Sequence, residues 1–114
     1  KGIKIEIWGE PPMTKRAGWL VWFPKFLSYW TTQCPAMTAT ALKAAVHRGQ
    51  IPCDTEFFNK VELISPGALK YDNLLHTLIV NLTTGPAFVV VSANSAFSGL
   101  ESLRRLAFQV DPSL

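Results

Sequence analysis

Charged residues are scarce in this sequence, at 17% of 114 residues, whereas apolar residues make up 48%. This balance argues against an intrinsically disordered chain, which combines low hydrophobicity with high net charge. The length is close to that of a common domain, so we expect residues 1–114 to form a single domain. Because the sequence starts with Lys1 rather than Met, we also expect a fragment or a processed part of a longer protein.

The sequence also lacks the motifs of several kinds of functional site. Neither Gly-x-Gly-x-x-Gly nor Gly-Lys-Ser/Thr is present, which argues against the phosphate-binding loops of nucleotide-binding proteins. The eight acidic residues are dispersed and give no support for a hydrolase with paired carboxylates. The sequence has no apolar run of about 20 residues that could span a bilayer and no pattern of a signal peptide.

Cysteine and histidine are rare as well, with Cys34, Cys53, His47 and His76 as their complete set. Two cysteines do not make a disulfide framework, so we expect free thiols and favour an intracellular, cytoplasmic location. The alternative is a single disulfide bond between Cys34 and Cys53. Zinc sites usually bring their ligands in close pairs, about two to four residues apart, and no two of these residues are so close. We therefore expect neither a metal nor a cofactor.

What the sequence does contain is alternating apolar residues, which are typical of strands. The longest apolar stretch, residues 74–92, predicts a β-hairpin at the centre of a sheet. Its first arm is residues 74–82, where apolar side chains alternate, and its second is residues 88–91. Between them, Thr83 to Pro86 have the composition of a hairpin turn. Similar patterns predict three further strands, at residues 1–8, 17–23 and 56–64.

Two helices are predicted by their end signals and by their periodicity. Residues 38–48 have high helix propensity and are followed by Gly49, a common residue just after a helix. Residues 98–110 begin with the capping-box spacing of Ser98 and Glu101. We therefore expect an α+β fold, in which a mainly antiparallel sheet of about five strands carries two helices packed on one face.

The second helix should place its leucines on the sheet. Leu100, Leu103 and Leu106 recur at helical spacing, and Glu101 can pair with Arg105 across one turn. Arg104 and Arg105 are expected to reach solvent.

The segment from Lys15 to Trp30 mixes aromatic with basic residues and is the best candidate for a functional surface. On a regular strand Trp19 and Trp22 point to opposite faces, and helices on one side of the sheet would bury one face only. The other face would present an apolar patch to a partner. We expect a non-enzymatic domain that binds protein or copies of itself through Trp19, Trp22, Lys25 and Tyr29, beside the edge of the first strand. The simpler alternative is that these aromatic side chains form the core.

Two other functions stay open. The net charge of +3 and the isoelectric point of about 9.1 permit binding to nucleic acid or to an anionic membrane, and salt dependence would reveal it. The basic residues available for such binding are Lys15, Arg16, Lys25, Arg48, Arg104 and Arg105.

The third possibility, less favoured, is a small cysteine-dependent enzyme. A thiolate nucleophile needs a histidine that a third polar group orients. Cys53 with His76, oriented by Asp54 or Asp72, is the best set that the sequence offers. Each residue also has a simpler structural interpretation, because cysteine is often buried in proteins and His76 falls in an apolar stretch.

Overall fold

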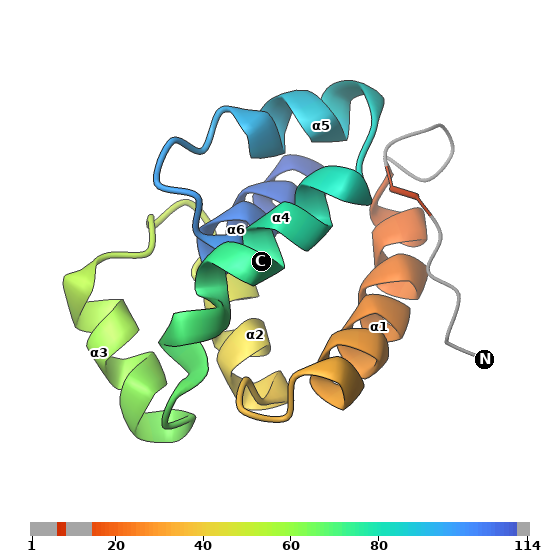
Figure 1. The fold of residues 1–114 in the computed structure, drawn as a ribbon. Coiled ribbons are helices and arrows are strands. Elements are labelled where there is room, and N and C mark those ends of the chain that lie inside the picture. The colour runs from red at the N-terminus through yellow and green to blue at the C-terminus, as the bar shows by residue number, and fades with distance from the viewer. Residues whose placement is uncertain (1–6, 9–14, 112–114) are drawn as a thin grey trace.

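The computed structural model describes residues 7–8 and 15–111, and every regular element within them is a helix (Figure 1). The elements are α1 (Arg16–Gln33), α2 (Ala39–Val46), α3 (Thr55–Ile64), the short 3-10 helix η1 (Ala68–Tyr71), α4 (Asp72–Asn81), α5 (Gly85–Ser92) and α6 (Gly99–Val110). The expected α+β fold with a five-stranded sheet is therefore wrong. The segments predicted as strands, 17–23, 56–64, 74–82 and 88–91, form parts of α1, α3, α4 and α5.

Extended pairing among the described residues is limited to one parallel bridge between Trp8 and Thr83. The backbone N–H of Trp8 donates to the carbonyl of Leu82 at 2.7 Å, and the carbonyl of Trp8 accepts from the N–H of Thr84 at 2.9 Å. The bridge ties the N-terminal segment to the connection between α4 and α5. Residues 1–6 of the predicted first strand lie outside the described residues.

The aromatic residues of α1 follow a helical period that competes with the alternating one. Trp19, Trp22, Phe26 and Trp30 recur every three or four residues, and all are at most 3% exposed. Val21, which the alternating pattern would place beside Trp19, is 56% exposed. Pro24 lies inside the helix on its exposed side, so the carbonyl group that lacks its helical donor does not face the core.

The segment predicted as a hairpin forms the two helices α4 and α5, again because its buried residues follow the helical period. Leu75 and Ile79 are four residues apart on α4 and both are fully buried, which is the helical and not the alternating period. Pro86, expected in a turn, lies in the first turn of α5, where its fixed φ angle suits a helix start. The valines of α5 have low helix propensity, but the burial of Ala87 and Val91 outweighs this preference.

Both predicted helices are confirmed, because their signals are local. Thr38 is the N-cap residue of α2, as predicted, whereas Gly49 lies two residues beyond the C-cap His47, in the following turn, with a φ of 65° that favours glycine. At the start of α6, the Ser98 hydroxyl accepts a hydrogen bond from the N–H of Glu101 at 3.2 Å, as the capping box predicts.

Helix α6 is central and packs against α1, α2, α4 and α5. Leu100, Leu103, Leu106 and Ala107 are at most 1% exposed, which confirms the predicted apolar face. Arg104, however, is only 7% exposed, so the expectation that it reaches solvent is wrong. The sequence pattern indicates only the apolar face of α6. In the structure other helices pack on more than one side of α6 and bury Arg104 as well.

The N-terminus of α6 lies very close to α4. A Cβ atom on Gly99 would lie 2.3 Å from Cγ of Leu75 and 2.7 Å from the backbone nitrogen of His76. Distances under 3.0 Å essentially do not occur for real Cβ atoms. Glycine is therefore required here to let the two helices approach.

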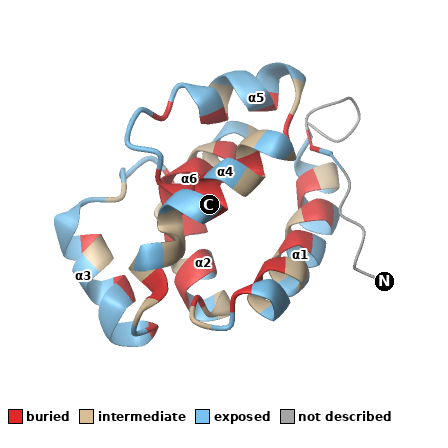
Figure 2. Cartoon of the chain, viewed as in Figure 1, coloured by how far each residue is buried: buried red, intermediate tan, exposed pale blue. Residues whose placement is uncertain are grey.

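Aromatic rings join helix α1 to Trp8 of the N-terminal segment. The ring centroid of Trp22 lies 5.6 Å from that of Trp8 and 5.0 Å from that of Phe26, and Trp8 also meets Trp19 edge to face at 5.6 Å. Figure 2 shows the buried side of α1 turned towards the other helices. The expectation that Trp22 or Trp19 faces solvent is therefore wrong.

Truncating Trp22 should be far more damaging than truncating its exposed neighbour on the same helix. We expect Trp22→Ala to lower the free energy of unfolding by about 3–5 kcal/mol, because it removes a buried ring that contacts three others. Leu20 is 53% exposed, so Leu20→Ala should change that free energy by less than about 0.5 kcal/mol. Urea unfolding followed by circular dichroism measures both, and equal effects would show that α1 does not pack through its tryptophans.

A methyl group at Gly99 should force α4 and α6 apart. We expect Gly99→Ala to destabilise the fold by at least about 1–3 kcal/mol, the usual cost of overpacking. The unfolding midpoint in urea reports this loss. An unchanged midpoint would contradict the close approach of the two helices.

Candidate functional site

Two surface features of this fold are suited to binding, and the first is a pocket between α1 and α4. It has a volume of about 340 Å³ and is lined by residues from the C-terminal end of α1, the following loop, η1 and α4. Its walls include Tyr29, Tyr71, Leu74 and Leu78, with the buried Cys34 among them. None of the lining residues is Lys, Arg, Asp, Glu or His.

The second feature is the outer face of α5, by which we mean Gly85, Phe88, Val89 and Ser92. These residues share one side of the helix by their spacing, and all four are exposed. Phe88 is 42% and Val89 65% exposed to solvent. The opposite side of α5 is buried by Ala87 and Val91, so the helix is apolar on both sides.

The outer face of α5 belongs to a long segment without charge. Between Asp72 and Glu101 the sequence contains no Lys, Arg, Asp or Glu. In Figure 1, α5 lies at the periphery of the molecule, above α4 and α6. Surfaces that meet other proteins are depleted of charge at their centre, whereas ordinary solvent-facing helices are not. The next exposed large side chain along the chain, Phe97, is 59% exposed and is also apolar.

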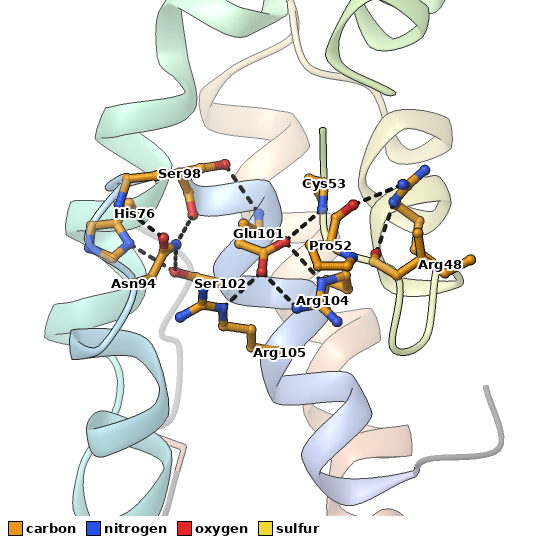
Figure 3. Close-up of polar contacts among 12 residues, drawn as sticks. Arg48, Pro52, Cys53, His76, Asn94, Ser98, Glu101, Ser102, Arg104 and Arg105 are labelled. Carbon is orange, nitrogen blue, oxygen red and sulfur yellow. Dashed lines mark hydrogen bonds and ion pairs between the residues drawn. The ribbon is translucent and has the colours of Figure 1, made fainter. Parts of the chain in front are cut away.

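The interior of the fold holds a charged network centred on Glu101 (Figure 3). Its carboxylate accepts hydrogen bonds from Arg104 at 2.6 and 2.9 Å, from Arg105 at 2.8 Å and from the backbone N–H of Cys53 at 2.9 Å. Arg104 also donates to the carbonyl of Gly49 at 2.6 Å. The pairing of Glu101 with Arg105 was predicted and is confirmed, but the stronger pairing with Arg104 was not predicted.

The protonation of this network follows from its contacts. Burial alone would raise the pKa of Glu101, but the hydrogen bonds from Arg104, the Cys53 backbone and Arg105 bring it down to about 2. Burial, and after it the charge of Glu101, raises the pKa of the Cys53 thiol to about 12. The thiol of Cys53 is therefore neutral near pH 7 and is a poor nucleophile.

A second polar network lies on the other side of α6 (Figure 3). His76 Nδ1 and the Ser102 hydroxyl share a hydrogen bond of 2.8 Å, and the Asn94 amide donates to that hydroxyl at 2.9 Å and to the Ser98 carbonyl at 2.8 Å. Ser102 is fully buried. Burial lowers the pKa of His76, and the nearby Asp72 offsets this only in part. Because the hydroxyl is buried and hydrogen-bonded to both His76 and Asn94, we interpret this network as structural.

The partner-binding residues predicted in α1 separate into two groups. Trp19 and Trp22 are 2% and 1% exposed and lie in the core. Lys25 is exposed and Tyr29 is half-buried, one helical turn further along the same side. Tyr29 lines the pocket between α1 and α4, so it is the one predicted aromatic residue that lies at a candidate site.

The basic residues proposed for anion binding are mostly neutralised by carboxylates. Arg16 pairs with Asp111 and Arg48 lies 3.7 Å from Asp54. Arg104 and Arg105 share Glu101, as described above. The guanidinium of Arg48 also stacks on a phenylalanine ring and donates to two backbone carbonyls. Lys15 and Lys25 are exposed on α1 and its N-terminal flank.

The cysteine and histidine proposed as a catalytic pair are not brought together. Cys53 lies beside Glu101 and His76 beside Ser102, on different sides of α6 (Figure 3). Asp54 and Asp72, which were proposed to orient the histidine, are helix caps instead. Asp54 accepts a hydrogen bond from the N–H of Phe57 at the start of α3, and Asp72 accepts one from the N–H of Leu100 at the start of α6. Over residues 7–8 and 15–111, no three His, Cys, Asp or Glu side chains gather to hold a metal ion.

Comparison with models of known protein families, with curated proteins and with solved structures finds no match for this chain. Of the helices that the structure describes, none combines the length and the apolar character needed to cross a membrane.

Sequence reasoning missed both surface features. The absence of charge from residues 73–100 was visible and could have indicated the face of α5. The Asp54 cap, three residues before Phe57, was a local signal that could have indicated helix α3. The pocket between α1 and α4 had no such signal, because its walls come from segments about 40 residues apart that meet only in the fold.

The charge of Glu101 should stabilise the fold at neutral pH and lose that effect in acid. Because its pKa falls from an ordinary value of 4.5 to about 2 in the folded state, this stabilisation is present above pH 4.5 and is lost as the pH falls towards 2. The difference in unfolding free energy between the parent and Glu101→Gln should therefore shrink as the pH falls. Urea unfolding at pH 6, 4 and 3 measures it, and a constant difference would contradict the assignment.

Proposed function

We propose that this chain is a non-enzymatic interaction domain that binds protein through the outer face of α5, with a second copy of the chain as its partner. The observation that supports the proposal is the exposure of Phe88 and Val89 on a peripheral helix within a segment that carries no charge. Contact with a partner removes an apolar surface of this kind from water, and this burial favours association. The surface that was expected to do this, around Trp22, is instead part of the core.

The absence of charge suits a second copy in particular. In a two-fold symmetric dimer each surface meets an identical surface, so every charge near the axis would face a like charge. Between Asp72 and Glu101 no Lys, Arg, Asp or Glu creates such repulsion. Phe88 and Val89, in the middle of the helix, can pack against the same residues of the second copy.

The expected association is weak. A helix of eight residues is about 12 Å long and cannot by itself provide the roughly 800 Å² per partner of a standard interface. We therefore expect a reversible dimer with a Kd on the order of 10–100 µM rather than a permanent one. Because the contact is apolar, it should persist as the salt concentration rises, unlike binding to a polyanion.

A charge placed on the outer face of α5 should prevent the association without unfolding the chain. We expect the parent to sediment as an increasing fraction of dimer from 10 to 500 µM, and Val89→Glu to remain monomeric, because Val89 is 65% exposed and a glutamate there stays hydrated in the monomer. Sedimentation velocity over this range measures both, with circular dichroism as a check of folding.

Leu63→Glu is the matched control, since Leu63 is 83% exposed on α3 and lies outside the outer face of α5. This variant should associate as the parent does. A parent that stays monomeric throughout the range would rule out the second copy as the partner. A parent whose association disappears at 0.5 M salt would instead favour a charged contact.

A further inference from the structure

The pocket between α1 and α4 is a separate feature from the outer face of α5 and shares no residue with it. Its volume of about 340 Å³ falls in the lower part of the range of about 300–1,000 Å³ that small-molecule sites occupy in proteins. Two of its lining residues, Trp30 and Cys34, are 3% and 6% exposed, so the pocket extends from the surface to the edge of the core.

The chemistry of the walls restricts what can enter. With no Lys, Arg, Asp, Glu or His among the lining residues, a charged group taken into the pocket would lose its hydration and find no opposite charge. The aromatic rings of Tyr29, Trp30 and Tyr71 and the side chains of Leu74 and Leu78 offer flat and apolar contacts instead. An uncharged molecule with a ring fits these walls.

The pocket also offers a few hydrogen-bonding groups. Within the described part of the chain, the side chains of Tyr29, Gln33 and Tyr71 make no hydrogen bond to another residue. Gln33 is exposed and the two tyrosines are half-buried, and their hydroxyl and amide groups can both donate to and accept from a ligand. A few polar groups on mainly apolar walls are the usual composition of a site that orients a small ligand.

We propose that this pocket binds a free, uncharged, ring-containing small molecule that carries one or two hydrogen-bonding groups. The proposal does not depend on association through α5. The aromatic side chain of a partner protein has related chemistry, but a free molecule can fill the whole volume down to Cys34.

The chain carries its own reporter of occupancy. Cys34 is one of the residues that line the pocket, whereas the Cys53 thiol, with its pKa raised to about 12, stays protonated and slow to react near pH 7.5. Alkylation by iodoacetamide at Cys34, located by peptide mass spectrometry, therefore measures access to the pocket.

The experiment uses N-phenyl-1-naphthylamine, an uncharged aromatic amine whose fluorescence rises in apolar surroundings. It is titrated against the Val89→Glu variant, so that the outer face of α5 neither associates nor offers an apolar patch to the probe. We expect a saturable rise with one probe per chain, and a slowing of Cys34 alkylation by roughly tenfold at saturation.

Leu74→Trp should fill the mouth of the pocket, since Leu74 lines it and is 57% exposed, so the larger ring need not disturb the core. We expect it to weaken probe binding by at least about tenfold. Leu63→Trp on α3, a change of the same size away from the pocket, should leave binding unchanged.

Three results would overturn the proposal: fluorescence that does not saturate, equal probe binding by Leu74→Trp and Leu63→Trp, or Cys34 alkylation unaffected by saturating probe. If instead Cys34 is protected only when the parent chain associates at high concentration, the pocket belongs to a protein contact and the small-molecule proposal is wrong. Dimerisation through α5 can fail without affecting any of these results.

Discussion

The fold depends on the burial of α6, which turns two charged side chains into internal partners. Helices pack around α6 on several sides, so Glu101 and Arg104 cannot both reach water and must hold each other. A buried charge without a partner costs several kcal/mol, which makes the pair a strict requirement of this arrangement. Glu101 also binds the backbone of Cys53, and Arg104 that of Gly49. The pair therefore fixes the connection between α2 and α3 against the central helix.

The same packing gives structural partners to several polar side chains. Glu101 is held by the arginines and His76 by Ser102, and Asp54 and Asp72 cap helices. Every buried side-chain nitrogen and oxygen among the described residues has a hydrogen-bond partner. At the surface of the described residues, the outer face of α5 and the pocket between α1 and α4 are mainly apolar.

Local signals in the sequence were sufficient for α2 and α6. In each helix one residue promotes the start or the end: Gly49 in the turn after α2, and the Ser98 hydroxyl at the start of α6. These effects act within a few residues. The errors arose where two periods coexist. In residues 17–23 and 74–82, apolar side chains recur both every second and every third or fourth residue, and only the packing partners decide which set is buried. The valines of α5 added a preference for strand that its buried side outweighed.

The sequence by itself determined that two helices form within residues 38–48 and 98–110, and that no standard nucleotide or zinc motif is present. Only the tertiary structure decided which apolar and charged side chains face water. Arg104 and Arg105 are neighbours with the same chemistry, yet the side chain of one is 8% and that of the other 33% exposed. Trp22 is in the core, whereas Phe88 is on the surface. Exposure depends on elements distant in sequence, and a local pattern carries no information about where those elements pack.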